Sequence, residues 1–261
     1  MFHSSLLRGK PVPSPGAERS GSARASRGAV TDWPTRMAEL AETAQDERLQ
    51  AFYRAGAPAP DTPLCDTPLL AMDVETTGLD PVKDGIVSIG LVPMGLDRIR
   101  LSAARYWLLK PRVPLAEASV AVHGITDSQI RHAPDLAAVL GELLQAMAGH
   151  VMVVHCRDME RLFLSHALLP RIGEGMEFPV IDTMDLEARL YRQQPVPWRD
   201  RWFWRRKPPV SIRLAASRAR YGLPRYRPHH AVTDALATAE LLQAQVAYRY
   251  TPQTPVREVW L

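Results

Sequence analysis

Apolar positions along this chain form short strand-like runs in its first half and helix-like stripes in its second half. Apolar runs beginning at residue 69 and at 86–93 and 98–109 are separated by short turns, which predicts an antiparallel meander. Further strands are expected at 151–154 and 178–181, and helices at 137–147, 159–169, 182–190, 214–221 and 229–248. This order predicts an α/β fold with a mixed five-stranded sheet flanked by helices.

The segments outside this region differ in composition. Residues 1–30 are rich in Ser, Gly, Ala and Pro and are basic, so a disordered basic tail is expected there. A transit peptide or a misassigned start codon would also explain this composition. Residues 31–66 join a helical pattern to a Pro-rich linker, which predicts a helical extension packed on the main domain at 67–250. Residues 251–261 are expected to form a C-terminal tail.

The composition is that of a globular protein with a substantial core, since 46% of the residues are hydrophobic. No run is long and apolar enough to span a membrane. The two cysteines, Cys65 and Cys156, lie far apart in different contexts and indicate neither a disulfide framework nor a thiolate metal site. A reducing cytoplasm fits this usage. The net charge of +4 is compatible with a polyanionic partner.

Two acids interrupt the first apolar run. Residues two apart in a strand share a face, so Asp73 and Glu75 project together while Met72 and Val74 point to the other side. Neighbouring carboxylates repel and lose hydration when partly buried, so a cation or a shared proton normally compensates them. A divalent metal is one explanation; a strand that simply ends in the polar turn at 76–78 is the other.

Further acids occur near later strand and helix boundaries. On the last predicted helix, Asp234 shares a face with Thr238 and Leu241. It is either a third metal-facing carboxylate or a first-turn acid that complements the helix dipole. The segment 154–160, which joins a strand to a helix, offers a fourth acid.

Together these motifs resemble the DEDDh 3′→5′ exonucleases. The resemblance rests on Asp-x-Glu-Thr-Thr-Gly at 73–78, an acid in the helix after a Val-rich strand and His155, and His-x-x-x-x-Asp at 229–234. It covers about residues 68–248 and implies an RNase H-like fold. It further implies that Asp73, Glu75, the second-motif acid and Asp234 bind two Mg²⁺ or Mn²⁺ ions, that His229 is the general base, and that Thr76, Thr77 and His123 contact the 3′-terminal nucleotide. On spacing alone His123, in the loop 119–126, would be structural.

The second motif departs from the family, which usually has Asp where this chain has Glu160. The nearby Asp158 lies about 200° away on a helix, so only one of the two can face the site. Glu160 falls beside the apolar stripe and Asp158 does not, so we assign Glu160. Its extra methylene shifts the carboxylate by roughly an ångström, which can cost about 10²-fold in a preorganised site.

A basic stretch lies between residues 189 and 227. Its cations include Arg205, Arg206 and Lys207, interleaved with aromatic residues. Such a mixture is typical of single-strand binding, in which cations contact phosphates and rings stack on bases. A solvated insertion whose aromatic residues pack on the domain or on a second subunit fits as well.

The sequence therefore predicts a metal-dependent 3′→5′ exonuclease that acts on single-stranded nucleic-acid ends, with DNA preferred, and releases nucleoside 5′-monophosphates. An RNase acting on short RNA or RNA 3′ tails is the second interpretation. A nucleic-acid-binding module weakened by the departure at Glu160 is the third. The sequence does not decide whether the protein works with a DNA polymerase or a repair complex, or whether it forms a homodimer.

Overall fold

The computed structural model describes residues 31–192 and 210–261. The predicted basic tail at 1–30 and the candidate substrate-binding residues Arg205, Arg206 and Lys207 lie outside the described residues. No helix in the described ranges is both long and apolar enough to cross a membrane.

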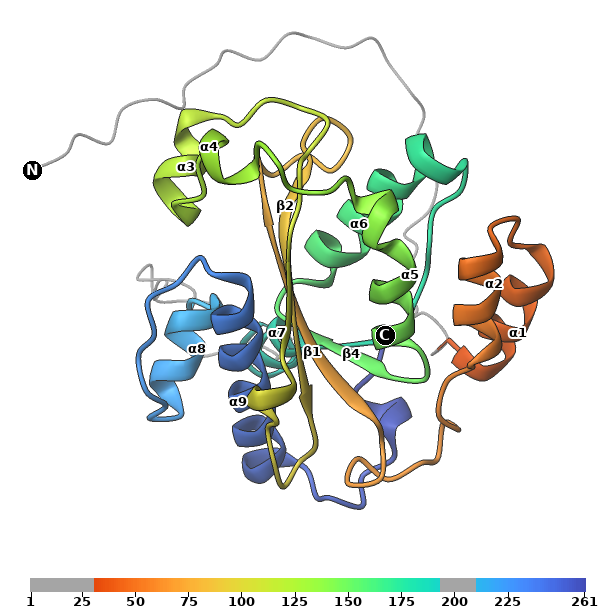
Figure 1. The fold of residues 1–261 in the computed structure, drawn as a ribbon. Coiled ribbons are helices and arrows are strands. Elements are labelled where there is room, and N and C mark those ends of the chain that lie inside the picture. The colour runs from red at the N-terminus through yellow and green to blue at the C-terminus, as the bar shows by residue number, and fades with distance from the viewer. Residues whose placement is uncertain (1–30, 193–209) are drawn as a thin grey trace, which may run out of the picture.

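A five-stranded mixed sheet forms the centre of the fold, in the order β3-β2-β1-β4-β5 (Figure 1). The strands are β1 (Leu69–Thr76), β2 (Ile86–Met94), β3 (Arg105–Leu108), β4 (Val151–Val154) and β5 (Val180–Asp182). β1, β2 and β3 are antiparallel neighbours, whereas β4 pairs in parallel with both β1 and β5. The predicted α/β class and mixed sheet are confirmed.

The third strand is shorter than the predicted 98–109. The chain first turns back on itself, with Gly95 N–H donating to the carbonyl of Arg98 over 2.8 Å. A 3₁₀ turn at Leu101–Ala103 follows, and pairing with β2 begins only at Arg105. The pattern of apolar residues alone does not distinguish such a turn from the strand that follows it.

Helices cover both faces of the sheet. On one side lie α5 (Leu136–Met147) and α6 (Arg157–Ile172); on the other lie α7 (Thr183–Tyr191) and α9 (Ala231–Arg249), with α8 (Leu214–Arg220) outside α9 (Figure 1). Residues 69–72 are at most 2% exposed, because the first half of β1 is buried on both faces. This explains the continuous apolar run at its start.

Two short helices, α3 (Glu117–His123) and α4 (Asp127–Ile130), lie beyond β3. The expectation of a loop at 119–126 is therefore wrong for its first half: His123 is the last residue of α3. Gly124, in the left-handed region at φ 74°, ends that helix. The helix has only seven residues, too few for a clear helical periodicity in the sequence.

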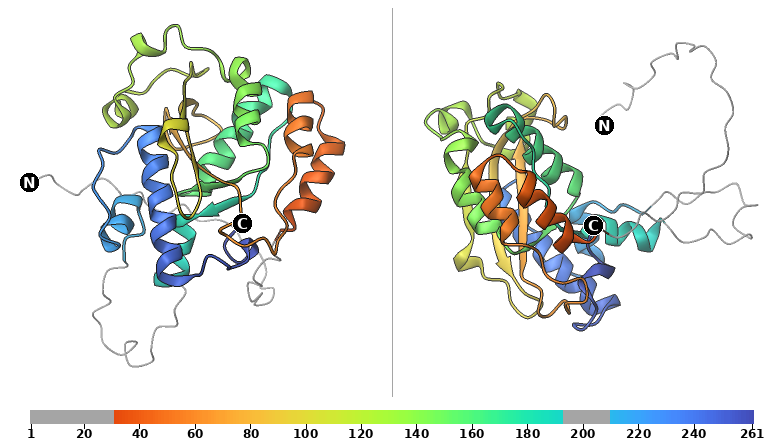
Figure 2. Two further views of the ribbon diagram at one scale, coloured as in Figure 1. Left: turned by 60° about the horizontal axis from the view of Figure 1, so that its bottom comes forward. Right: turned by 90° about the vertical axis from the view of Figure 1, so that its right-hand side faces the viewer.

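The N-terminal extension comprises α1 (Trp33–Thr43) and α2 (Glu47–Arg54), and it joins the main core through buried residues such as Met37 and Leu49. The indole of Trp33 donates to the carbonyl of Leu261 over 2.9 Å. The C-terminal residues, expected only as a tail, contain a 3₁₀ turn at Val256–Glu258 and a buried Trp260 that bridges Ile181 of β5. Both ends of the described chain thus meet beside the sheet (Figure 2).

Candidate active site

The two acids of β1 lie just beyond the point where β1 separates from β4. The parallel pairing of the two strands ends at Ala71 and Val153, so Asp73 and Glu75 have no strand on that side. Across β2 they face Gly90 and Ser88, and all four residues share the sheet face that α9 covers. Asp73 is half-buried and Glu75 is buried. The prediction that both carboxylates project to one face is confirmed.

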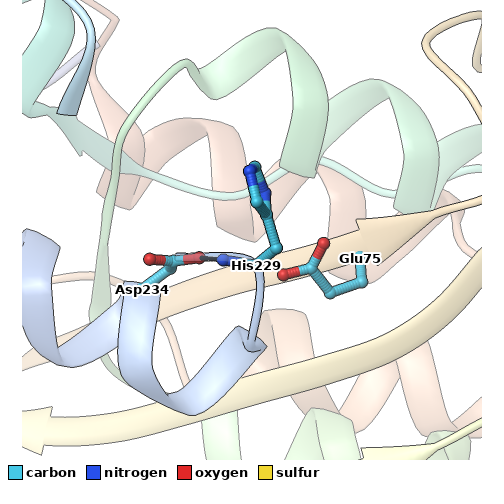
Figure 3. A group of neighbouring side chains, drawn as sticks. All are labelled: Glu75, His229 and Asp234. Atoms are coloured by element: carbon cyan, nitrogen blue, oxygen red, sulfur yellow. Dashed lines mark hydrogen bonds between the residues drawn. The ribbon is translucent and has the colours of Figure 1, made fainter. Parts of the chain in front are cut away.

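The start of α9 brings Asp234 and His229 to these acids. One side-chain ligand atom each from Glu75, His229 and Asp234 lie within 4.8 Å of one another (Figure 3). The backbone N–H of His229 donates to Asp234 Oδ2 over 2.6 Å, which fixes the residues before the helix to its first turn. His229 is in the left-handed region at φ 68°, an uncommon conformation for a non-glycine residue. Its imidazole is exposed.

Gly90 allows this close approach of α9 to the sheet. A Cβ atom at position 90 would lie well inside van der Waals contact with the backbone of Ala231 and Val232. On the far side of Gly90, Tyr106 of β3 stacks on the ring of His230, with centroids 5.3 Å apart. The row Asp73, Gly90 and Tyr106 across three strands therefore seats the first turn of α9.

The two candidate second-motif acids, Glu160 and Asp158, differ in burial. Glu160 in the first turn of α6 is 2% exposed, whereas the Asp158 side chain is 74% exposed and lies 3.7 Å from Arg157. Glu160 is close enough to Asp73 for its charge to raise the pKa of that carboxyl. Oε2 of Glu160 is buried and has no hydrogen-bond partner among the described residues. Glu160 is therefore the buried acid of the two, as the helical wheel predicted, and its assignment as the second-motif acid stays a prediction.

These acids are costly to hold without a cation. Burial, together with the charges of Glu160, Glu75 and Asp234, raises the pKa of Asp73 well above its usual value. Burial and the charge of Asp234 raise the pKa of Glu75 to about 7. Burial raises the pKa of Glu160 as well, with smaller contributions from Asp182 and Asp158. Clustered carboxylates and one unpartnered buried oxygen fit hard divalent cations such as Mg²⁺ or Mn²⁺.

His123 lies near the same cluster. Its Nδ1 accepts from the N–H of Ile125 over 2.9 Å, and its Nε2 is buried with no partner among the described residues. Burial, and then the charge of His229, lowers the pKa of His123. The structure thus brings α3 close to the start of α9, a proximity that the spacing of the two histidines in the sequence does not reveal.

The two threonines after β1 use their hydroxyl groups within the chain. Thr76 donates to the carbonyl of Gly78 over 2.5 Å. Thr77 donates to Asp84 Oδ1 over 3.1 Å and accepts from the N–H of Gly85. A Cβ at position 78 would meet the Asp84 carboxylate, so a larger residue there would displace the side chain that holds Thr77 and the N–H of Asp80. Thr77 is buried and closes the loop, whereas Thr76 is half-buried beside Glu75.

Sequence reasoning gave no role to the carboxylate of Asp182. Its oxygens accept from the N–H groups of Cys156 and Arg157 at the start of α6, over 3.1 and 3.0 Å. They also accept from Met184 over 2.9 Å at the start of α7. One carboxylate therefore holds the helix that carries Glu160. The signal in the sequence was an Asp at the start of the helix predicted at 182–190, in a pair with Thr183 that also resembles the exonuclease family.

Comparison with known proteins agrees with this geometry. The model of the exonuclease family matches residues 70–242. The chain belongs to this exonuclease family. The match runs from β1 to the middle of α9 and includes every member of the acid cluster, so these residues form an exonuclease domain.

Relatives of this exonuclease domain include proteins named for DNA polymerase III. The DNA polymerase III subunit epsilon-like protein of Rhodobacter capsulatus is 31% identical over 181 residues, which is 69% of this chain and 24% of that protein. The PolC-type DNA polymerase III of Thermotoga maritima is 28% identical over 69% of this chain and 12% of that protein. The chain thus spans a quarter or less of the length of these relatives.

Solved structures place the exonuclease domain in the RNase H-like fold. Exonuclease X in complex with 5′ overhanging duplex DNA superposes with a TM-score of 0.52 at 22% identity, covering 72% of this chain and 98% of that one. The nuclease domain of 3′hExo, a DEDDh family member bound to rAMP, gives a TM-score of 0.56 at 16% identity, covering 69% and 92%. The part of the chain that these structures cover thus has the fold of known exonucleases.

Proposed function

We propose that this chain is a metal-dependent 3′→5′ exonuclease that removes nucleoside 5′-monophosphates from single-stranded DNA ends. The observation that carries the proposal is the convergence of Glu75, His229 and Asp234 within 4.8 Å, beside Asp73 at the end of β1. Family membership supplies the reaction class. The epsilon-like and PolC-type names of the relatives support a DNA substrate and a DNA polymerase or repair complex as a partner.

Asp73, Glu75, Glu160 and Asp234 would hold two divalent cations. Their oxygens are the hard donors that Mg²⁺ and Mn²⁺ prefer, and Glu160 Oε2 has a free lone pair for such an ion. When bound, a pair of divalent ions in a nuclease supplies an activated water and stabilises the charge that develops on the leaving oxygen. Binding would also offset the repulsion that raises the pKa of Asp73.

His229 acts as the general base in this proposal. Its exposed ring lies beside the Glu75 and Asp234 carboxylates, where an attacking water would stand. A ring nitrogen of neutral His229 accepts the proton from that water as the phosphorus–oxygen bond forms. The leaving 3′ oxygen remains on the shortened strand, and the released nucleotide keeps the 5′-phosphate.

The terminal nucleotide would lie between the β1 turn and α3. Thr76 borders this space beside Glu75, and His123 offers a buried Nε2 without a partner among the described residues. Because Thr77 is buried and closes the loop to Asp84, we assign it to shaping this space rather than to contacting the nucleotide. Arg205, Arg206 and Lys207 stay proposed contacts to phosphates upstream.

Two alternatives remain tied to specific observations. An RNase is supported by 3′hExo, the DEDDh neighbour whose structure holds rAMP. A binding module that has lost turnover is supported by the Glu160 departure alone. The exonuclease proposal differs from both in requiring cleavage of DNA.

The test compares His229→Ala with His230→Ala on 5′-labelled DNA and RNA strands of one sequence, in Mg²⁺ and in Mn²⁺. We expect wild-type protein to shorten DNA faster than RNA, and His229→Ala to lose roughly 10²-fold or more in turnover, as expected for loss of a general base. Metal-induced thermal stabilisation should persist in His229→Ala. Faster cleavage of RNA would establish the RNase reading, and wild-type turnover in His229→Ala would remove His229 from the mechanism.

A further inference from the structure

A hollow of about 430 Å³ lies between α8, the loop at 222–228 and the first turn of α9. Its walls are mostly small or apolar, and Asp234 lies on its border. Its lining includes Ala219, Arg225 and Tyr226. Because Asp234 belongs to the acid cluster as well, the hollow adjoins the candidate active site.

The aromatic wall of the hollow is held firmly. The Tyr226 hydroxyl donates to Glu240 Oε1 over 2.8 Å, and the guanidinium of Arg218 lies 4.8 Å from the ring centroid. Arg218 is itself 4% exposed and donates to the carbonyls of Ala237 and Pro224. The ring of Tyr226 is therefore preorganised, so little conformational entropy is lost when a ligand packs against it.

The chemistry of this hollow suits a nucleobase. Small apolar side chains leave room for a flat ring, and an aromatic wall offers stacking that tolerates any base. At the rim, Arg225 and Arg227 are exposed, and no ion pair involves either of them in the described ranges. Exposed guanidinium groups beside a base-sized hollow are suited to contacting the phosphates of the same strand.

We propose that this hollow binds the base of the nucleotide on the 5′ side of the scissile bond, with Arg225 on its phosphate. The inference rests on the proposed exonuclease function and deepens it. On one side of His229 lies Glu75, which Thr76 follows in β1; on the other side lies Asp234 (Figure 3), and the hollow adjoins Asp234. A strand with its terminal nucleotide on the first side and the next base in the hollow places the bond between them over the carboxylates.

Filling the hollow tests the inference without touching the acids. Ala219 is exposed on α8, where Leu is nearly as good a helix former as Ala, so Ala219→Leu should fold normally. Ala51→Leu, at an exposed position in the middle of α2, is the matched control. Two substrates are compared: a single-stranded thymidine oligonucleotide, and the p-nitrophenyl ester of thymidine 5′-monophosphate, which has a terminal nucleotide but no base on its 5′ side.

We expect Ala219→Leu to raise KM for the oligonucleotide roughly tenfold, as loss of one stacked base does, and to leave hydrolysis of the ester unchanged. Ala51→Leu should match wild type on both substrates. Arg225→Gln should reduce the slope of log affinity against log salt by about 0.7, the value for one phosphate contact on a single strand.

The outcomes separate this inference from the proposed function. If wild type hydrolyses both substrates and Ala219→Leu leaves both KM values unchanged, the hollow does not bind the base. Equal losses on oligonucleotide and ester would also overturn the inference, because the nitrophenyl ring of the ester is bonded directly to the phosphate oxygen and the ester has no sugar that could carry a base into the hollow. If wild type hydrolyses neither substrate, the proposed function fails, and the inference fails with it.

Discussion

The ring of Tyr106 lies on the imidazole of His230, with centroids 5.3 Å apart and planes 11° from parallel. His230 is the N-cap residue of α9, and its Nδ1 lies 3.4 Å from the N–H of Thr233. The stack therefore connects β3, which carries no acid of the cluster, to the residue directly after His229. We infer that Tyr106 is a positioning residue for His229, the proposed general base.

Replacing Tyr106 tests this role. Tyr106→Ala should lower kcat about tenfold, because a small displacement of a catalytic group is costly in a preorganised site, and should change KM little. Tyr106→Phe keeps the stacking face and should restore kcat. Steady-state kinetics on a single-stranded oligonucleotide gives both values. A kcat that is as low in Tyr106→Phe as in Tyr106→Ala would show that stacking is not what positions His229.

Gly90 offers a second test of how α9 is seated. The added methyl group in Gly90→Ala forces the start of α9 away from β2, so we expect a loss of about 1–3 kcal/mol in the free energy of unfolding. Gly141→Ala is the control, since this exposed glycine lies inside α5 and an added Cβ would meet only Arg48 Cδ, at an ordinary contact distance of 3.9 Å. It should stabilise by about 0.5–1 kcal/mol. Urea unfolding measures both, and equal effects would refute the close-approach argument.

His155 gives a prediction on pH. Burial lowers its pKa to about 4, below the 6.5 of an exposed histidine, so the folded protein binds fewer protons than the unfolded chain between these values. The free energy of unfolding should therefore fall as pH drops from about 6.5 to 4, by at most about 3 kcal/mol from this group. The contribution is fully present above pH 6.5.

His155→Gln removes this titration while keeping a donor toward the carbonyl of Ile212, which His155 Nε2 approaches to 3.1 Å. Its stability should depend less on pH in this window than that of wild type. The exposed His132, changed to Gln, should leave the pH dependence unaltered. Parallel pH curves for wild type and His155→Gln would contradict the assignment.

Glu160 and Asp158 form a matched pair for a stability measurement. Because the raised pKa of Glu160 means that the folded state prefers its neutral form, Glu160→Gln should raise the melting temperature at pH 8 without metal. Asp158→Asn should leave it unchanged, since that side chain is 74% exposed. Added Mn²⁺ should stabilise wild type more than Glu160→Gln. The opposite order of melting temperatures would mean that Glu160 is compensated within the protein.

The inward-facing residues of this site could be predicted from the sequence because their signals are local. Strand alternation placed Asp73 and Glu75 on one face. The helical wheel placed Glu160, but not Asp158, beside the apolar stripe of its helix, and in the structure Glu160 is buried and Asp158 is exposed. The order of strands and helices likewise indicated the mixed sheet. Each of these inferences needs only the period of a single element.

What could not be predicted depends on contacts between distant segments. Tyr106 meets His230, and Gly90 meets Ala231, more than a hundred residues later in the chain. The periodicity of β2 and β3 does not indicate that α9 packs against these strands. The packing of Trp260 beside β5 was missed for the same reason. One wall of the hollow beside α8 is the ring of Tyr226, which contacts Glu240 of α9 and Arg218 of α8.

The central claim is that the carboxylates around Asp73, with Glu160 in place of the usual Asp, form a working metal-dependent nuclease site. The most direct measurement follows a 5′-labelled single-stranded DNA over time in Mn²⁺ with equal amounts of wild type, Glu160→Gln and Asp158→Asn. We predict a ladder that shortens from the 3′ end and free nucleoside 5′-monophosphates for wild type and Asp158→Asn, and an intact strand for Glu160→Gln. An intact strand with wild type in Mn²⁺ and in Mg²⁺, or equal cleavage by Glu160→Gln, would contradict the account.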